Sequence, residues 1–291
     1  MGRILTLSIL VLVFSLHAKA QQTDSLYAKA VSWKVQNEKV NTDHMYNIKP
    51  WIDIPATVVA AGFSLNGFRI IYGRDEIPES EVLGLNRNSV NRFDRPVTYN
   101  YSASAKQTSD YFFYGSMPLP LLLYLDKNVR KDGLRVGLLY VEALGITGIF
   151  YTGGAMLANR YRPITYNTDL PMELRRDGGN RNSFPGGHPA LVATSTFFMA
   201  KVLSDYHPEM RHKWVLYTLA GGVTFTTAYL RFKAGYHFKT DLIAGVAFGT
   251  LSGILVPHFH KSKAYNESRL AIMPNYENGQ TGLTALYKLG K

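Results

Sequence analysis

Residues 181–189 read Arg-Asn-Ser-Phe-Pro-Gly-Gly-His-Pro, and a mostly apolar stretch continues from there to residue 206. A glycine pair followed by proline and an apolar stretch is typical of a turn that leads into a helix. The first backbone N–H groups of a helix have no partner inside the helix, so they can bind an anion. The sequence therefore predicts a buried helix over 189–206 with an anion site at its start, formed by Gly186 and Gly187.

Five further apolar segments have the length of helices rather than strands. They cover residues 53–72, 111–125, 134–158, 213–229 and 240–257. We therefore expect an all-α bundle of about six core helices. The tail differs, because residues 270–289 alternate in polarity around Asn278-Gly279, which predicts a small C-terminal β-hairpin.

The N-terminus has the layout of a secretory signal peptide. A basic start at Arg3, an apolar stretch over 4–16 and the small residues Ala18 and Ala20 predict cleavage after residue 20, with an uncleaved anchor as the alternative. The predicted organisation is then a signal peptide over 1–20, a polar leader over 21–50, a helical catalytic domain over 51–260 and a tail over 261–291. An exported chain is not expected to bind nucleic acid.

Composition narrows the chemistry. The chain has 291 residues, a formal charge of +11, 46% hydrophobic and 18% charged residues, and no cysteine. This excludes disulfide scaffolds, thiolate zinc clusters and thiol nucleophiles, and it argues against a disordered chain. The surplus of positive charge favours anionic partners such as phosphorylated substrates or acidic lipids.

A membrane-embedded bundle and a soluble bundle both fit the apolar segments. A membrane span needs about 20 mostly apolar residues, and only 213–229 and 240–257 are nearly free of charge. The connections 127–131 and 211–213 are basic, which places both in the cytoplasm if the chain is embedded. With a cleaved signal peptide, this requires that 53–72 or 111–125 does not span.

Two more polar clusters border the apolar segments. The first, residues 159–163, contains Arg160 and Arg162, whose guanidinium groups can bind phosphate oxygens in pairs. The second contains Arg231, His237 and Asp241. His237 and Asp241 are four residues apart, which places them on one face if a helix begins there. A carboxylate so placed can hold one imidazole nitrogen and leave the other free to attack.

Each cluster alone also has a structural explanation. Arginines pair with carboxylates such as Asp169, and Pro-Gly-Gly often forms a simple tight turn. A zinc site built from His188, His237 and Asp241 has no supporting His-x-x-x-His pair, so we predict no metal.

Taken in order, the clusters resemble the three signature motifs of the type 2 phosphatidic acid phosphatase (PAP2) superfamily, which includes bacterial acid phosphatases and vanadium haloperoxidases. The family pattern is Lys-x6-Arg-Pro, then Pro-Ser-Gly-His, then Ser-Arg-x5-His-x3-Asp. The chain matches it at Arg162-Pro163, at Pro185, Gly187 and His188, and at Arg231, His237 and Asp241. The resemblance covers roughly residues 110–257 and implies a PAP2-type helical bundle.

The resemblance also implies roles for these residues. His237 would be the nucleophile that forms a phosphohistidine, Asp241 its orienting partner, and His188 the acid that protonates the leaving oxygen. Arg162 and Arg231 would hold the phosphoryl group. Gly186, Gly187 and Arg160 are further candidates for phosphate binding. The family needs no metal or cofactor for hydrolysis.

Three positions depart from the family pattern. Ala155 stands where the family has lysine, Gly186 where it has serine, and Leu230 replaces the serine before Arg231. A lost cation at a phosphate site weakens transition-state stabilisation by a few kcal/mol. Arg160 and Lys233 are the candidates to replace it.

The expected function is a phosphomonoesterase at the periplasmic face of the inner membrane, integral or associated. Its expected substrate is a phosphorylated lipid, with lipid A, phosphatidate and polyprenyl diphosphate as candidates. The alternatives are a soluble periplasmic acid phosphatase that acts on small phosphomonoesters, a vanadium haloperoxidase, and a non-catalytic protein that binds phosphate or lipid.

Overall fold

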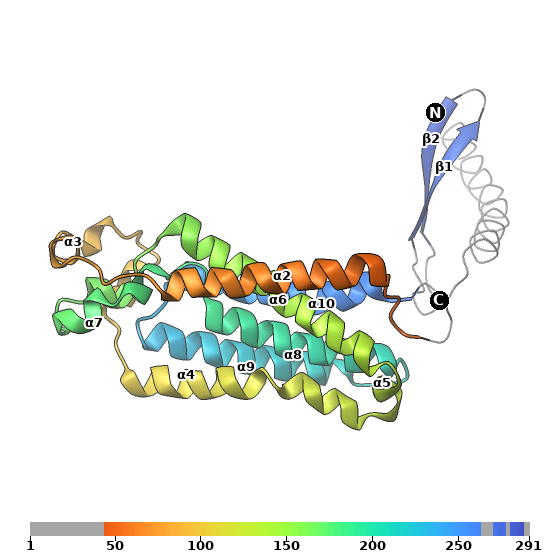
Figure 1. Ribbon diagram of the computed structural model, residues 1–291, viewed down its shortest axis with the longest axis horizontal. Helices are drawn as coiled ribbons and strands as arrows, with labels where there is room; N and C mark the ends of the chain where they lie inside the picture. The colour runs from red at the N-terminus through yellow and green to blue at the C-terminus, as the bar shows by residue number, and fades with distance from the viewer. Residues whose placement is uncertain (1–43, 263–269, 278–279, 288–291) are drawn as a thin grey trace, which may run out of the picture. The chain divides into compact units, whose positions relative to one another are not determined.

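The computed structural model describes residues 44–262, 270–277 and 280–287. The predicted signal peptide over 1–20 and most of the predicted leader lie outside these residues. Residues Met45–Lys261 form one compact unit, drawn in Figure 1 as a set of long helices. Its long elements are α2 (Pro50–Tyr72), α4 (Ala103–Ser116) with η3 (Leu119–Leu125), α6 (Gly133–Ala158), α8 (Gly187–Tyr206), α9 (Lys213–Lys233) and α10 (Lys239–His260).

Short elements cap the two ends of this bundle. At one end lie α3 (Glu79–Leu83), η1 (Arg87–Ser89), η2 (Arg95–Tyr99), η4 (Pro163–Tyr166), α7 (Met172–Arg176) and η5 (Gly178–Arg181). The opposite end carries α5 (Lys127–Lys131), and Figure 1 shows α5 far from α3 and α7. The long elements therefore run alternately between a loop-rich end and a basic end.

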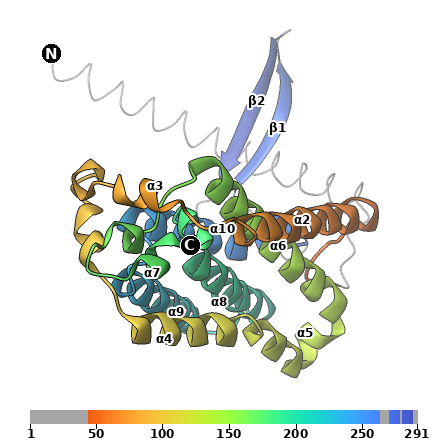
Figure 2. The same ribbon diagram turned by 60° about the vertical axis from the view of Figure 1, so that its left-hand side comes forward.

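Helix α8 is the centre of the bundle. It packs against α4, α6, α9 and α10, and 15 of its 20 residues are buried. Figure 2 shows α8 surrounded by the other long helices. The predicted helix over 189–206 is confirmed, and its start at Gly187 agrees with the glycine turn in the sequence.

Glycines bring α10 close to the backbone of α8. A Cβ added to Gly249 would lie 2.7 Å from the carbonyl carbon of Ala190, and one added to Gly253 would lie 2.7 Å from the carbonyl oxygen of Thr194. Gly245 approaches the backbone of Gly186 in the same way. Because the three glycines are four residues apart, they form one face of α10, and this face fixes the start of α8 against the start of α10.

The outer surface of the bundle is apolar. Trp51, Leu134 and Leu157 are each more than nine-tenths exposed. Three stretches are long and apolar enough to cross a membrane: Pro50–Tyr72, Gly133–Tyr166 and Lys239–His260. The bundle therefore has the surface of a membrane-associated protein.

The second apolar segment begins earlier than the sequence suggests. Helix α4 starts at Ala103, where the Ser102 hydroxyl accepts a hydrogen bond from the Ala105 N–H, and not at residue 111. Its first half is polar because part of it faces a cavity described below. Leu119–Leu125 then continues as a 3-10 helix after Pro118.

The tail forms the predicted hairpin. Strands β1 (Leu270–Glu277) and β2 (Gln280–Tyr287) pair antiparallel, with Leu270 opposite Tyr287 and Glu277 opposite Gln280. The Asn278-Gly279 pair between them lies outside the described residues.

The close approach of α8 and α10 predicts that Gly249→Ala lowers stability by about 2 kcal/mol, because the added methyl group overlaps the backbone of α8. Gly153→Ala in α6 is the matched control, since no atom lies within 4 Å of the added Cβ and alanine favours the helix. Thermal unfolding of the detergent-purified chain measures both variants. Equal melting temperatures for the two would contradict this packing.

Candidate active site

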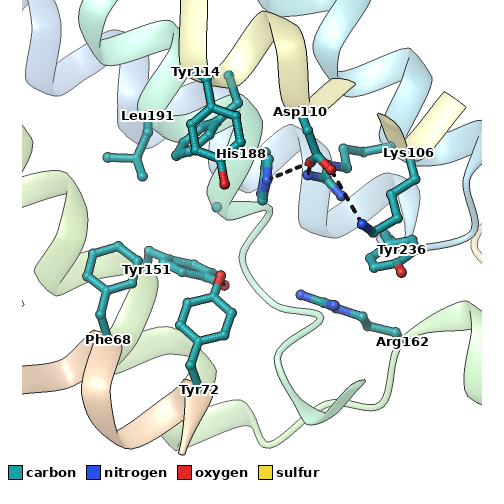
Figure 3. A pocket seen from close by; sticks show the side chains of 13 residues that line it. Phe68, Tyr72, Lys106, Asp110, Tyr114, Tyr151, Arg162, His188, Leu191 and Tyr236 are labelled. Atoms are coloured by element: carbon teal, nitrogen blue, oxygen red, sulfur yellow. Dashed lines mark hydrogen bonds and ion pairs between the residues drawn. The ribbon is translucent and has the colours of Figure 1, made fainter. Parts of the chain in front are cut away.

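A cavity of about 390 Å³ opens near the loop-rich end of the bundle, between α2, α4, α6 and α8. One side of it is aromatic and aliphatic, with Phe68, Tyr72, Phe113, Tyr114, Tyr151 and Leu191. The other side is polar, with Lys106, Asp110, Arg162, His188, Arg231 and Tyr236. Figure 3 shows the charged groups facing the same space as the aromatic rings.

Two buried arginines define the polar side. Arg162 follows α6 and is 8% exposed, and Arg231 in the last turn of α9 is 2% exposed. The Nε atoms of both lie buried without a hydrogen-bond partner among the described residues. Both guanidinium groups lie over the ring of Tyr236, at 4.9 and 5.4 Å from its centroid. Buried donors that lack an acceptor have the chemistry to bind an anion.

His188 lies at the start of α8 and points into the cavity (Figure 3). Its Nε2 is 3.3 Å from Oδ1 of Asp110, and the same oxygen accepts a hydrogen bond from Nη2 of Arg231. Burial lowers the pKa of His188 to about 4, although Asp110 opposes this shift. Burial also acts to raise the pKa of Asp110, but the hydrogen bond with His188 and the charge of Arg231 outweigh it and lower this pKa to about 2.

His237 is buried in the loop between α9 and α10. Its Nδ1 lies 2.7 Å from the carbonyl oxygen of Ser183. A carbonyl oxygen only accepts, so Nδ1 must carry the proton, and the lone pair of the neutral ring lies on Nε2. Burial and the charges of Arg162 and Arg231 hold the pKa of His237 well below its usual value. The ring is therefore neutral near pH 7, with Nε2 unprotonated. His237 is 1% exposed and is not among the residues that line the cavity.

The predicted pairing of Asp241 with His237 is not formed. Two residues four positions apart share a face only when both lie in a helix. Helix α10 begins only at Lys239, so His237 precedes it. The Asp241 carboxylate instead accepts from the Ser183 hydroxyl at 2.6 Å and from the Phe238 N–H at 2.8 Å. It therefore reaches His237 indirectly, by fixing the serine whose carbonyl holds the ring.

The two glycines of the turn have different surroundings: Gly186 contacts Asp241, and Gly187 lines the cavity. The Gly186 N–H donates to the carbonyl of Asp241 at 2.8 Å, so it is not free for phosphate as predicted. A Cβ on Gly186 would lie 3.2 Å from that same oxygen, which leaves little room for the serine of the family pattern. Gly187 lines the cavity, and the N–H groups of Gly187 and His188 begin α8 without intrahelical acceptors.

Arg160 is also placed differently from the prediction. Its guanidinium lies between two fully buried carboxylates, those of Asp94 and Asp241, and over the ring of Phe238. It does not line the cavity, because both of its terminal nitrogens bind these carboxylates. Lys233 is likewise absent from the cavity wall and lies over the Tyr229 ring.

Lys106 and Asp110 line the cavity but are not among the site residues predicted from the sequence, because they precede the predicted apolar segment over 111–125. The signal was present, because Lys106, Asp110, Phe113 and Tyr114 have the spacing of one helix face. Among the described residues, no group of His, Cys, Asp and Glu side chains is arranged to hold a metal ion.

The family model of the PAP2 superfamily matches residues 136–265, which contain all three motif segments. Over these residues, a little less than half of its length, the chain is similar to the PAP2 superfamily. Phosphatidylglycerophosphatase B of Bacillus subtilis strain 168 is 33% identical over 78 residues. That match covers 26% of this chain and only 38% of the length of that relative.

Two solved structures of PAP2-related proteins are similar to this chain. The crystal structure of the transmembrane PAP2 type phosphatidylglycerolphosphate phosphatase from Bacillus subtilis aligns with a TM-score of 0.44 and 18% identity, covering 72% of this chain and 95% of that one. Aquifex aeolicus LpxE aligns with a TM-score of 0.33 and 24% identity, covering 56% of this chain and 90% of that one.

The position of Arg160 between two buried carboxylates predicts that Arg160→Ala destabilises the protein by about 3 kcal/mol, because both carboxylates lose their cation. Arg92→Ala, which removes an exposed arginine from a nearby loop, should change stability by less than about 0.5 kcal/mol. Chemical denaturation in detergent compares the two. An Arg160→Ala protein of wild-type stability that has lost phosphate binding would instead restore the sequence-based assignment.

Proposed function

We propose that the protein is a phosphatase that removes phosphate from a phosphomonoester through a phosphohistidine on His237. One observation carries the proposal: two buried guanidinium groups with unpartnered Nε atoms face a cavity that His188 also lines. Donors in that arrangement suit the charge that builds up on a transferring phosphoryl group.

The proposed reaction has two steps. In the first, Nε2 of His237 attacks phosphorus, an N–P bond forms, the P–O ester bond breaks, and His188 gives its proton to the leaving oxygen. In the second, His188 takes a proton from water, which attacks phosphorus and breaks the N–P bond. Phosphate leaves, and both histidines return to their starting states.

The electrostatics of the cavity support these roles. The positive charges of Arg162 and Arg231 contribute to the low pKa of His188 in the empty cavity. A bound phosphate dianion would offset those charges, so the pKa of His188 would rise and the ring could bind the proton that the leaving group needs. Arg162 and Arg231 are the proposed phosphate ligands, with the N–H groups of Gly187 and His188.

A phosphorylated lipid is the proposed substrate. The aromatic side of the cavity suits an apolar chain, and the apolar outer surface of the bundle suits contact with a membrane. The name of the partial relative, a phosphatidylglycerophosphatase, points the same way. A small soluble phosphomonoester is the alternative.

The charge at the two ends supports an orientation with the site outside the cytoplasm. The basic connections at Lys127–Lys131 and Arg211–Lys213 lie at the end opposite the cavity, and basic loops favour the cytoplasm. This orientation places Pro50 on the cytoplasmic side. A cleaved signal peptide would place it outside, so the two sequence signals disagree for a bundle with six crossings.

We expect the detergent-purified chain to release phosphate from phosphatidate in mixed micelles in the presence of a chelator, because no step above uses a metal. His237→Ala should lower the rate by at least about 10³-fold, since it removes the attacking nitrogen. Malachite green detection of phosphate measures both. Retained turnover in the variant contradicts the phosphohistidine route, and faster release from a small phosphomonoester favours the soluble-substrate alternative.

The lack of cysteine allows a direct test of orientation. Glu173→Cys places a thiol in an exposed position at the loop-rich end, and Lys131→Cys is its matched counterpart at the basic end. In intact spheroplasts, a membrane-impermeant maleimide should label only the residue-173 variant, and permeabilisation should expose both. The reverse pattern would place the cavity on the cytoplasmic side.

A further inference from the structure

The anion site lacks one cation if only the motif residues are counted. Arg162 and Arg231 contribute two positive charges, but Asp110 lies in the same cavity and binds Arg231. With neutral histidines, these three groups sum to one positive charge. A phosphomonoester carries nearly two negative charges near neutral pH. Before His188 takes up a proton, the motif residues and Asp110 therefore balance only half of the charge of such a ligand.

A third cation enters the cavity from α4. Lys106 lines the cavity, and its Nζ lies 3.4 Å from Oδ2 of Asp110, one helical turn further along. Figure 3 shows the ammonium group facing the same space as Arg162. With Lys106 included, the cavity carries three positive charges and one negative charge, which matches a phosphate dianion.

Ala155, Arg160 and Lys233 do not supply this charge to the cavity. Ala155 is fully buried against Ile71 and Tyr151 and presents no cation. Arg160 binds two carboxylates outside the cavity, and Lys233 lies over Tyr229.

The Lys106 side chain is also free enough to respond to a ligand. Its side chain is 46% exposed, and the 3.4 Å contact with Asp110 is long for a charge-assisted hydrogen bond. A half-exposed lysine pair of this kind has little net stability, so the ammonium group can turn toward an incoming anion at low cost.

We infer that Lys106 is a phosphate-binding residue of this site and makes it selective for dianionic monoesters over monoanionic diesters. The inference rests on the proposed function for its substrate class. The positive charge that distinguishes monoesters from diesters then comes from Lys106 in α4, which lies outside the three motifs.

Calorimetric titration of the full chain in detergent at pH 8 tests this, with inorganic phosphate as the dianion and dimethyl phosphate as the monoanion. Lys106→Gln should weaken phosphate binding about tenfold and dimethyl phosphate binding clearly less, because the lost Coulomb energy scales with ligand charge. Lys106→Arg should retain the preference for phosphate. Lys233→Gln removes an equivalent charge outside the cavity and should bind both ligands as the wild type does.

Several outcomes would overturn the inference: an equal loss for both ligands, no loss in Lys106→Gln, or no phosphate binding by the wild type. The titrations and the hydrolysis assay together distinguish a failure of this inference from a failure of the proposed function. A chain that binds phosphate through Lys106 but hydrolyses nothing refutes the phosphatase and leaves Lys106 assigned. Hydrolysis that depends on His237 but not on Lys106, with unchanged phosphate binding, refutes Lys106 alone.

Discussion

The buried carboxylate of Asp241 is the constraint on which the site depends. It bonds to Arg160 before the first motif arginine, to the Ser183 hydroxyl ahead of the glycine pair, and to the Phe238 N–H after His237. A fully buried charge is costly unless it is paired and hydrogen-bonded, so these contacts are made together. One side chain thereby joins three segments that are far apart in the sequence, and it sets Ser183 where its carbonyl fixes the His237 ring.

The need to pair buried charges also explains why Arg160 has a structural role, whereas Arg162 and Arg231 keep donors for a ligand. Arg160 meets two buried carboxylates, so its charge is satisfied inside the protein. Arg162 has no salt-bridge partner among the described residues, and Arg231 has Asp110, yet both keep an unpartnered buried Nε. Neighbouring cations thus become structural or ligand-binding according to the carboxylates within reach. Sequence spacing alone does not reveal this difference.

The long helices could be predicted from the sequence because each contains a long apolar segment. The helix that begins after the Gly186-Gly187 turn follows directly from local chemistry, and so does the tail hairpin. The start of α4 was missed because its cavity-facing residues, including Lys106, are polar and resemble a connection. The Asp241–His237 pair was mispredicted because an offset of four residues has meaning only inside a helix, and the helix begins between them. The sequence favours Gly186 and Arg160 as phosphate ligands because it does not reveal that Asp241 accepts from the Gly186 N–H and that Asp94 and Asp241 bind Arg160.

A covalent phosphoryl group at His237 is the central step of the proposed reaction. Rapid quenching of the purified chain with a ³²P-labelled phosphomonoester, followed by peptide mapping, tests it directly. We expect a base-stable, acid-labile label on the peptide that contains His237, formed within one turnover and lost as phosphate is released. A chain that turns over substrate without any labelled peptide, or with the label on another residue, would contradict it.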